Sequence, residues 1–154
     1  MPTLEPATMS DVAQAMSWSP DDASFRLWAG PATPSGLSLE QAWQLLTQAP
    51  RLTFATRAAD GSLLGFGQLT FNEPHWGHLA RIVVAPQLRG QGLGRGLCLA
   101  LMDLADEIDP QLIGWTLFVA PHNYSALSLY ASLGFDVCQV AQGLSWRMQK
   151  LRSA

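Results

Sequence analysis

Hydrophobic residues recur along the chain with two different spacings, which separate predicted helices from predicted strands. Apolar positions three and four residues apart indicate one face of a helix, whereas short runs of β-branched and aromatic residues indicate strands. The longest helical pattern covers residues 93–108 and stops at Asp109-Pro110; its apolar positions are Leu93, Leu97, Ala100, Leu101, Leu104 and Ile108. We therefore expect a helix of about four turns there, with one face buried.

The same criteria divide the rest of the chain into shorter elements. Helices are expected after a cap at Ser10-Asp11, after a cap at Ser38, and over residues 125–133, where Gly134 ends the pattern. The proline-rich residues 19–36 are expected to form short helical turns and loop. Strands are expected at residues 3–7, 52–57, 63–71, 76–84, 113–120, 135–140 and 144–148.

Turn residues connect several of these strands. Asp60-Gly61 lies between two β-rich runs and is a hairpin signal, and residues 72–75 form a second connection, into the strand that starts at Trp76. Gln142-Gly143 indicates a closing hairpin between the last two strands. No internal repeat or low-complexity tract interrupts this order.

Length and charge limit the classes of protein that the chain can belong to. The chain has 154 residues, of which 48% are hydrophobic, so it can bury one core but is too short for two comfortable domains. We expect a single domain over residues 1–154. Nine basic and twelve acidic residues give a net charge of −3, so no sequence-wide positive field favours nucleic acid as a partner.

The cysteines and the longest apolar runs exclude further classes. Cys98 and Cys138 form neither a CxxC motif nor a cluster with histidine, so we expect two buried thiols, no metal site and no disulfide framework. The sequence opens without a basic-then-apolar leader, and none of its apolar runs is long enough for a membrane span. These observations favour a cytoplasmic protein that has no membrane partner.

The most informative stretch is rich in glycine and joins the strand at residues 76–84 to the helix at residues 93–108. Glycines let successive backbone N–H groups turn toward one point, and the positive end of the following helix attracts an anion such as pyrophosphate. The spacing excludes a dinucleotide fingerprint, because Arg95 occupies the position of the third glycine after Gly90 and Gly92. A P-loop is excluded too, since no Gly-Lys-Ser/Thr is present.

Two ordered motifs carry a family resemblance. The first is Arg-x-x-Gly-x-Gly, present as residues 89–94 after a strand that ends in Val84-Ala85-Pro86; the second comprises Asn123, Ala126, Leu129, Tyr130, Leu133, Gly134 and Phe135. Together they resemble the signature of the GCN5-related N-acetyltransferases, the GNAT superfamily. The resemblance covers residues 52–148 well, whereas the residues before Gln48 match only in their order of strand and helices.

The resemblance implies a fold and a cofactor site. The fold is α+β, with a mixed, mostly antiparallel sheet of six or seven strands, helices on both faces, and a central pair of strands that splay apart. The co-substrate is acetyl-CoA, bound between those strands along Ile82, Val83 and Val84, with the Ile82 N–H donating to the thioester carbonyl. Its pyrophosphate would be held by Arg89, Gly90, Gln91, Gly92, Leu93, Gly94 and Arg95, mainly through backbone N–H groups.

Three of the residues assigned by resemblance carry a second interpretation from the sequence. Arg95 fits a solvated helix residue as well as a charge partner. Asn123 fits an N-cap, although we expect it to contact the arm of the cofactor. Tyr130 matches the general acid of the family, which protonates the departing thiolate, but it also fits a core position of an amphipathic helix.

The general base is the weakest part of the resemblance. Many members carry a glutamate on the strand before the signature or on the one after it, whereas this chain has His78 and Phe118 there. An imidazole titrates in a useful range, so we predict that His78 is the base, directly or through water. Glu73, His75 and a chain of ordered water are the alternative bases. His78 also fits a half-exposed surface histidine without a catalytic role.

The acceptor is less defined than the cofactor. Trp18, Phe25, Trp28 and Trp76 lie in segments that line the acceptor cleft in relatives, so they are candidates for an aromatic acceptor pocket, although core packing explains each of them equally well. We expect an N-acetyltransferase that acts on a small-molecule amine or a peptide by direct attack in a ternary complex. The resemblance leaves room for a homodimer. The alternatives are a longer acyl group, a protein N-terminus or lysine as acceptor, and a catalytically silent acyl-CoA-binding module.

Overall fold

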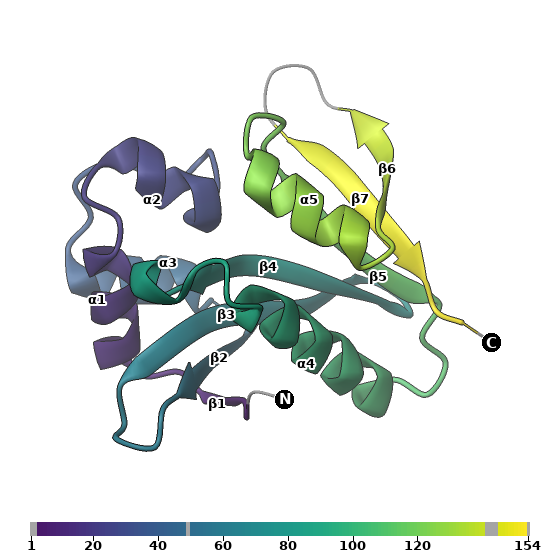
Figure 1. Cartoon of the computed structure of the whole chain (residues 1–154), viewed down its shortest axis with the longest axis horizontal. Helices are drawn as coiled ribbons and strands as arrows, with labels where there is room; N and C mark the ends of the chain where they lie inside the picture. Colours follow the sequence, from purple (N-terminus) through teal and green to yellow (C-terminus); the bar gives the residue numbers. More distant parts are fainter. Residues whose placement is uncertain (1–2, 49, 141–144, 154) are drawn as a thin grey trace.

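The computed structural model describes residues 3–48, 50–140 and 145–153. Seven strands form one mixed sheet in the order β1-β2-β3-β4-β5-β7-β6 (Figure 1). Neighbouring strands are antiparallel except β4 and β5, which run parallel. The strands are β1 (Glu5–Pro6), β2 (Leu52–Arg57), β3 (Leu63–Glu73), β4 (Trp76–Val84), β5 (Gly114–Val119), β6 (Asp136–Val140) and β7 (Trp146–Leu151). The α+β fold with a mixed, mostly antiparallel sheet is confirmed.

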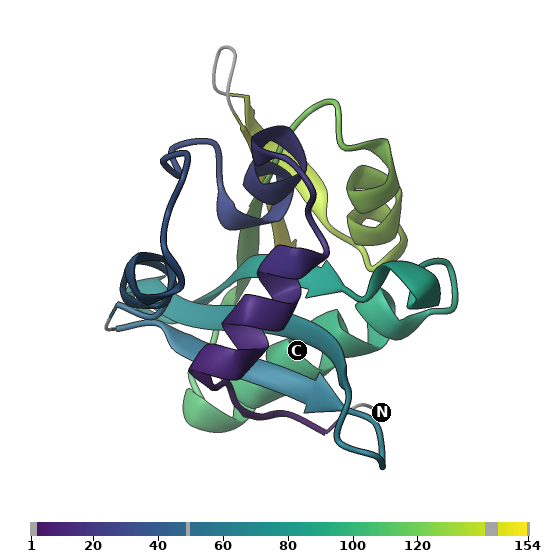
Figure 2. The same ribbon diagram turned by 90° about the vertical axis from the view of Figure 1, so that its left-hand side faces the viewer.

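Helices cover both faces of the sheet, as the views in Figures 1 and 2 show. They are α1 (Met9–Ser17), α2 (Asp22–Ala29), α3 (Leu39–Leu46), the short 3-10 turn η1 (Pro86–Leu88), α4 (Leu93–Ile108) and α5 (Tyr124–Ser132). Helices α1, α2 and α3 form one apolar core with β2 and β3, while α4 and α5 form a second core with β4 and β5. Successive strand residues point to opposite faces, so one strand can supply both cores.

Glycines on β3 and β4 face helix α4 and leave no room for a larger residue between the helix and the sheet. A Cβ atom added to Gly77 would lie 2.9 Å from the Cβ of Ala105, and one added to Gly67 would lie 3.0 Å from a methyl group of Leu101. Real Cβ atoms rarely approach this closely, so a larger residue at Gly77 would push the helix away from the sheet.

The start of α1 differs from the sequence prediction. The helix begins at Met9, and its cap is Thr8 rather than Ser10-Asp11. The Thr8 side chain accepts the Asp11 backbone N–H, and the Asp11 carboxylate accepts the Thr8 N–H at 2.8 Å, which completes a capping box. Asp11 is nearly buried and also pairs with Arg57 on β2, so it serves α1 and the sheet at once.

Cys138 also differs from its prediction. Cys98 is buried on α4, but Cys138 is exposed on β6. Strand β6 is the last strand of the sheet, and each of its five residues is exposed. The other strand and helix predictions agree with the structure to within a few residues, while the predicted turn at Gln142-Gly143 lies outside the described residues. Over the described ranges no helix is long and apolar enough to cross a membrane.

The feature that creates a site is the separation of β4 from β5. Their parallel pairing runs from Trp76 opposite Gly114 to Leu79 opposite Leu117 and stops there. Strand β4 continues to Val84 without a partner from β5. The splayed central pair that the family resemblance implied is therefore present.

Candidate active site

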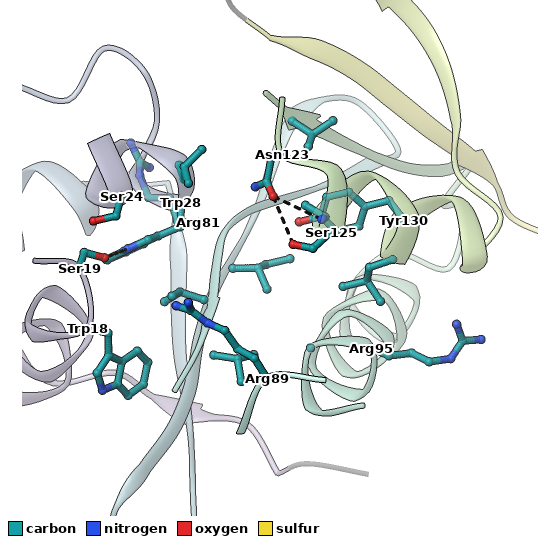
Figure 3. A pocket seen from close by; sticks show the side chains of 18 of the residues that line it. Trp18, Ser19, Ser24, Trp28, Arg81, Arg89, Arg95, Asn123, Ser125 and Tyr130 are labelled. Carbon is teal, nitrogen blue, oxygen red and sulfur yellow. Dashed lines mark hydrogen bonds between the residues drawn. The ribbon is translucent and has the colours of Figure 1, made fainter. Parts of the chain in front are cut away.

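A cleft of about 680 Å³ lies where β4 and β5 separate. Figure 3 shows its two sides: Trp18, Ser19, Ser24 and Trp28 come from the α1 and α2 region, while Ser125 and Tyr130 come from α5 on the other side. Residues 79–84 of β4 and Phe118 and Val119 of β5 also line the cleft. The cleft thus combines three parts of the chain that are distant in sequence.

The glycine stretch lies at the beginning of α4 and borders the cleft. Gly90 and Gly92 adopt left-handed backbone conformations, with φ of 80° and 83°, which glycine adopts without steric cost. Gly92 is the N-cap of α4 and provides no side-chain cap. The first helical N–H groups therefore have no partner within the helix, and with the positive end of the 16-residue helix they suit a phosphate.

Residues of the glycine stretch border two hollows. Arg89, Gly90, Gly92, Gly94 and Arg95 line the cleft. Gln91 and Leu93 line a second hollow together with Leu64 and Leu99, and Gly92 and Arg95 border both hollows.

The two arginines of this stretch have different surroundings. Arg95 donates from Nη1 to the Ser132 hydroxyl at 2.9 Å, which connects α4 to the end of α5. Arg89 is exposed, and Figure 3 shows its side chain beside the unpaired end of β4. The Arg89 guanidinium adds positive charge to the side of the cleft where the helix N-terminus lies, whereas Figure 3 shows the Arg95 side chain pointing away from Arg89.

Strand β4 reaches the cleft through a bulge that the sequence gave no sign of. The register with β3 shifts between Phe66 opposite Val83 and Gln68 opposite Ala80, so β4 contains one extra residue there. Arg81 has a φ of 50°, a left-handed conformation that is uncommon for a residue with a side chain. Ile82, Val83 and Val84 follow the bulge and line the cleft. They are the residues that the resemblance assigned to the arm of the cofactor.

Arg81 also holds α2 against the sheet. Its Nε donates to the Ala29 carbonyl at the end of α2 at 2.9 Å, and its Nη1 donates to Gln68 Oε1 at 3.0 Å. Gln68 is fully buried, and its amide donates to the Leu46 carbonyl at the end of α3 and to the Thr53 hydroxyl. Burial lowers the pKa of Arg81 to about 10, so the side chain remains cationic. The bulge, α2 and α3 are therefore joined by one polar network.

Helix α5 contributes two of the predicted residues. Asn123 lines the cleft and also caps α5, since its side-chain oxygen accepts the Ala126 N–H at 3.4 Å. Tyr130 lines the cleft too, although it is only 9% exposed and packs edge-on against Phe135. Burial, and secondarily Cys98, raises the pKa of Tyr130, so its phenol holds a proton at physiological pH.

His78 lies outside the main cleft. It lines a neighbouring pocket of about 160 Å³ with Asn72, Glu73, Trp76, Thr116, Phe118 and Arg147. Of these residues only Phe118 also lines the cleft. Nδ1 of His78 hydrogen-bonds the Thr116 hydroxyl at 2.8 Å. Burial lowers the pKa of His78 to about 4. The positive charge of Arg147 also lowers this pKa, and its effect is larger than the opposite effect of Glu73.

The alternative bases and the aromatic candidates also separate in space. Glu73 lines the pocket of His78 and forms an ion pair with Arg147 at 2.9 Å. His75 lies in the turn between β3 and β4, and its Nδ1 is 2.8 Å from the carboxylate of Asp109 at the end of α4. Trp18 and Trp28 line the cleft. Phe25 is buried against Trp28, with ring centroids 5.1 Å apart, and Trp76 lines the pocket of His78. Among the residues that the structure describes, no group of three His, Cys, Asp or Glu side chains suits a metal ion.

Solved structures of other proteins share this fold. A GCN5-related N-acetyltransferase from Kribbella flavida is 24% identical with a TM-score of 0.78, and the match covers 97% of each chain. A spermidine N-acetyltransferase from Vibrio cholerae, solved in complex with CoA and spermine, is 21% identical with a TM-score of 0.75; the match covers 97% of this chain and 94% of that one. A domain from Methanocaldococcus jannaschii is 14% identical with a TM-score of 0.80 and covers 99% of both.

The sequence itself decides the family. Residues 14–135 match the model of the acetyltransferase (GNAT) family. This range includes the cleft residues from Trp18 to Tyr130. The chain therefore belongs to the acetyltransferase (GNAT) family and is an acetyl-CoA-dependent N-acetyltransferase.

Proposed function

We propose that the cleft transfers acetyl from acetyl-CoA to a primary amine by direct attack of the amine on the thioester, with both substrates bound together. The observation that carries this proposal is that the separation of β4 and β5 opens one cleft that borders both the helix-start anion site at Gly92 and the Tyr130 side chain. If the pyrophosphate of acetyl-CoA binds at Gly92, its thioester arm lies along Ile82, Val83 and Val84 and points toward Tyr130.

The lining of the cleft supports direct transfer over a covalent acyl-enzyme. An enzyme nucleophile such as serine or cysteine needs an adjacent base or a lowered pKa. The described residues that line the cleft include Ser19, Ser24 and Ser125 but no histidine, aspartate or glutamate that could activate them. Cys98 does not line the cleft, and burial raises the pKa of its thiol to about 12. The amine itself is thus the best nucleophile for the thioester.

In the proposed reaction the neutral amine attacks the carbonyl carbon, and a C–N bond forms as the C–S bond breaks. The Ile82 N–H donates to the carbonyl oxygen while negative charge develops on it. Tyr130 gives its proton to the departing thiolate. Its buried phenol holds that proton at physiological pH, and its raised pKa makes it a weaker acid than a free tyrosine, so the transfer depends on the position of the hydroxyl beside the sulfur. The amide nitrogen releases its extra proton to water, and the Tyr130 phenolate regains a proton from water, so the cycle closes with no net change in protons.

His78 stays a prediction as the base. Its pocket adjoins the cleft only at Phe118, so a proton from the amine would reach it through water. The lowered pKa keeps the imidazole neutral and able to accept a proton, but the same lowering makes it hold that proton weakly. Because the pKa of His78 is about 4, any acidic limb of the rate profile near neutral pH would belong to the ammonium of the acceptor rather than to His78.

The test is a CoA-release assay against a panel of amines, run on the wild type and on Tyr130→Phe. The substitution keeps the ring and its contact with Phe135 and removes only the hydroxyl. We expect turnover to fall by about two orders of magnitude with acetyl-CoA affinity unchanged. Full turnover in the variant would exclude Tyr130 as the acid. No CoA release with any amine, together with normal acetyl-CoA binding, would favour a silent binding module.

A further inference from the structure

The wall of the cleft opposite α5 has a distinct chemistry. It comprises Trp18, Ser19, Pro20, Ser24, Leu27 and Trp28. These side chains are aromatic, aliphatic or hydroxylic, and none of them is charged. Leu27 is 44% exposed although it is large and apolar, so it presents apolar surface to a ligand.

The charged side chains that line the cleft are all cationic. They are Arg81, Arg89 and Arg95, and among the described residues no aspartate or glutamate joins them. Residues 1–2, 49, 141–144 and 154 contain no acidic residue in the sequence either. Asp21, the acidic residue next to Pro20, does not line the cleft: it caps α2 by accepting the Ser24 N–H at 2.8 Å.

This charge distribution opposes a second cationic group on the acceptor. Removing an ammonium from water costs several kcal/mol unless a carboxylate pairs with it, and Arg81, the cleft arginine that the pyrophosphate does not neutralise, adds repulsion. An indole face can attract a cation by about 0.5–2 kcal/mol. Trp28 has little of its face to offer, because Phe25 and Phe66 pack against it at 5.1 and 5.9 Å and its N–H donates to the Ser19 hydroxyl. Trp18 is the other indole in this wall, and its attraction falls short of the several kcal/mol that desolvation costs.

We infer that the acceptor is a monoamine whose body is aromatic or aliphatic and uncharged, so that the reacting nitrogen is its single basic group. This inference rests on the proposed function, that the cleft acetylates an amine. It separates the chain from the Vibrio cholerae enzyme, which has the same fold and was solved with spermine, a polyamine. Likeness of fold at 21% identity does not carry the acceptor across.

The inference is tested with two acceptors of equal length and different charge. Hexylamine and cadaverine have the same number of non-hydrogen atoms and differ at one end, which is a methyl group in the first and an ammonium group in the second. We expect kcat/KM for hexylamine to exceed that for cadaverine by at least about tenfold. Equal or better use of cadaverine or spermidine would overturn the inference, as would a requirement for a carboxylate on the acceptor.

A variant and a matched control assign the discrimination to this wall. Leu27→Glu places a carboxylate on α2 in the cleft, and we expect it to reduce the preference for hexylamine by about tenfold. Leu151→Glu adds the same charge at a 60%-exposed position at the end of β7, outside the cleft, and should leave the preference unchanged. If Leu27→Glu, still stabilised by acetyl-CoA against heat, kept the wild-type preference, this wall would not select the acceptor.

The same assay separates failure of the inference from failure of the proposed function. Transfer to cadaverine or spermidine in preference to hexylamine leaves acetyl transfer intact and overturns only the acceptor class. Absence of CoA release with any amine overturns the proposed function, and the inference falls with it.

Discussion

The two walls of the cleft are built from different parts of the polypeptide. The wall at the start of α4 presents backbone N–H groups, arranged by Gly90 and Gly92 in left-handed conformations. The wall at α2 presents side chains, among them the exposed Leu27, and is tied to the sheet through Arg81. A backbone wall suits a ligand that is the same in every reaction, whereas a side-chain wall can change its ligand through single substitutions. We infer that α4 serves the common co-substrate and α2 serves the acceptor.

The largest expected effect comes from placing a side chain in the backbone wall. Gly92→Asp puts a carboxylate at the helix start, where it would compete with a phosphate and also impose a left-handed conformation on a residue with a Cβ. We expect acetyl-CoA affinity, measured by calorimetry, to fall by at least about a hundredfold, since charge repulsion and lost N–H contacts act together.

Gly61→Asp is the matched control for this variant. Gly61 has a φ of 87°, close to the 83° of Gly92, and like Gly92 it has no atom within 4 Å of an added Cβ. It lies between β2 and β3, away from the cleft. Equal loss of affinity in both variants would attribute the effect to backbone strain, and normal affinity in Gly92→Asp would remove the anion site from the start of α4.

An intermediate effect is expected from loosening the side-chain wall. Arg81→Asn tolerates the left-handed conformation but removes the guanidinium from the Ala29 carbonyl and Gln68 Oε1. We expect the KM of the acceptor to rise by about tenfold and stability to fall by about 1–3 kcal/mol, with acetyl-CoA affinity within about twofold. Steady-state kinetics and calorimetry measure these quantities.

Arg26→Asn provides the comparison for Arg81→Asn. Arg26 also lies on α2 but donates to the Thr33 carbonyl and the Ser35 hydroxyl, outside the cleft. Its loss should leave the acceptor KM unchanged. A rise in acetyl-CoA Kd in Arg81→Asn as large as the rise in acceptor KM would contradict the division of labour between the two walls.

The smallest effect concerns the pocket of His78 beside the side-chain wall. Burial lowers the pKa of His78 from 6.5 to about 4 in the folded protein, so below about pH 6.5 the unfolded chain takes up a proton that the native state does not. Stability from this group is present above pH 6.5 and is lost as the pH falls toward 4. We expect His78→Gln to remove part of that loss, seen as a difference of about 2–4 °C in Tm at pH 5 relative to pH 7.

His122→Gln serves as the control for the stability measurement, because His122 is exposed. The two variants should differ in the pH dependence of Tm, not only in Tm itself. If the curves of Tm against pH were parallel for the two variants, burial would not lower the pKa of His78, and its pocket would be open to water.

Much of the fold and of the backbone wall follows from local sequence patterns. A strand, a glycine run and a periodic helix predict the α4 start, and the spacing of Asn123 and Tyr130 puts both on one short helix. Arg81 gives no such signal: its two acceptors, Ala29 and Gln68, lie 52 and 13 residues away, and an arginine in the sequence does not indicate a positive φ. Its part in the site depends on tertiary packing.

The position of His78 likewise could not be predicted from local sequence patterns. Counting residues back from the glycine motif selects His78, but the bulge at Arg81 changes which β4 side chains face the cleft. Cys138 is a similar case, because an apolar run predicts burial only when another strand or helix covers it, and β6 is at the edge of the sheet. Local patterns determine which elements form, and packing determines what each residue contacts.

The close approach of α4 to Gly67 and Gly77 has a consequence for the energetics of binding. Because the helix rests directly on the backbone of β3 and β4, its N-terminal N–H groups are held in position before any ligand arrives. A preorganised site loses little conformational entropy and needs little rearrangement when an anion binds, so more of the interaction energy appears as affinity. Enlarging Gly77 to alanine, far from the phosphate, would therefore weaken acetyl-CoA binding through the orientation of α4 rather than through any contact with the ligand.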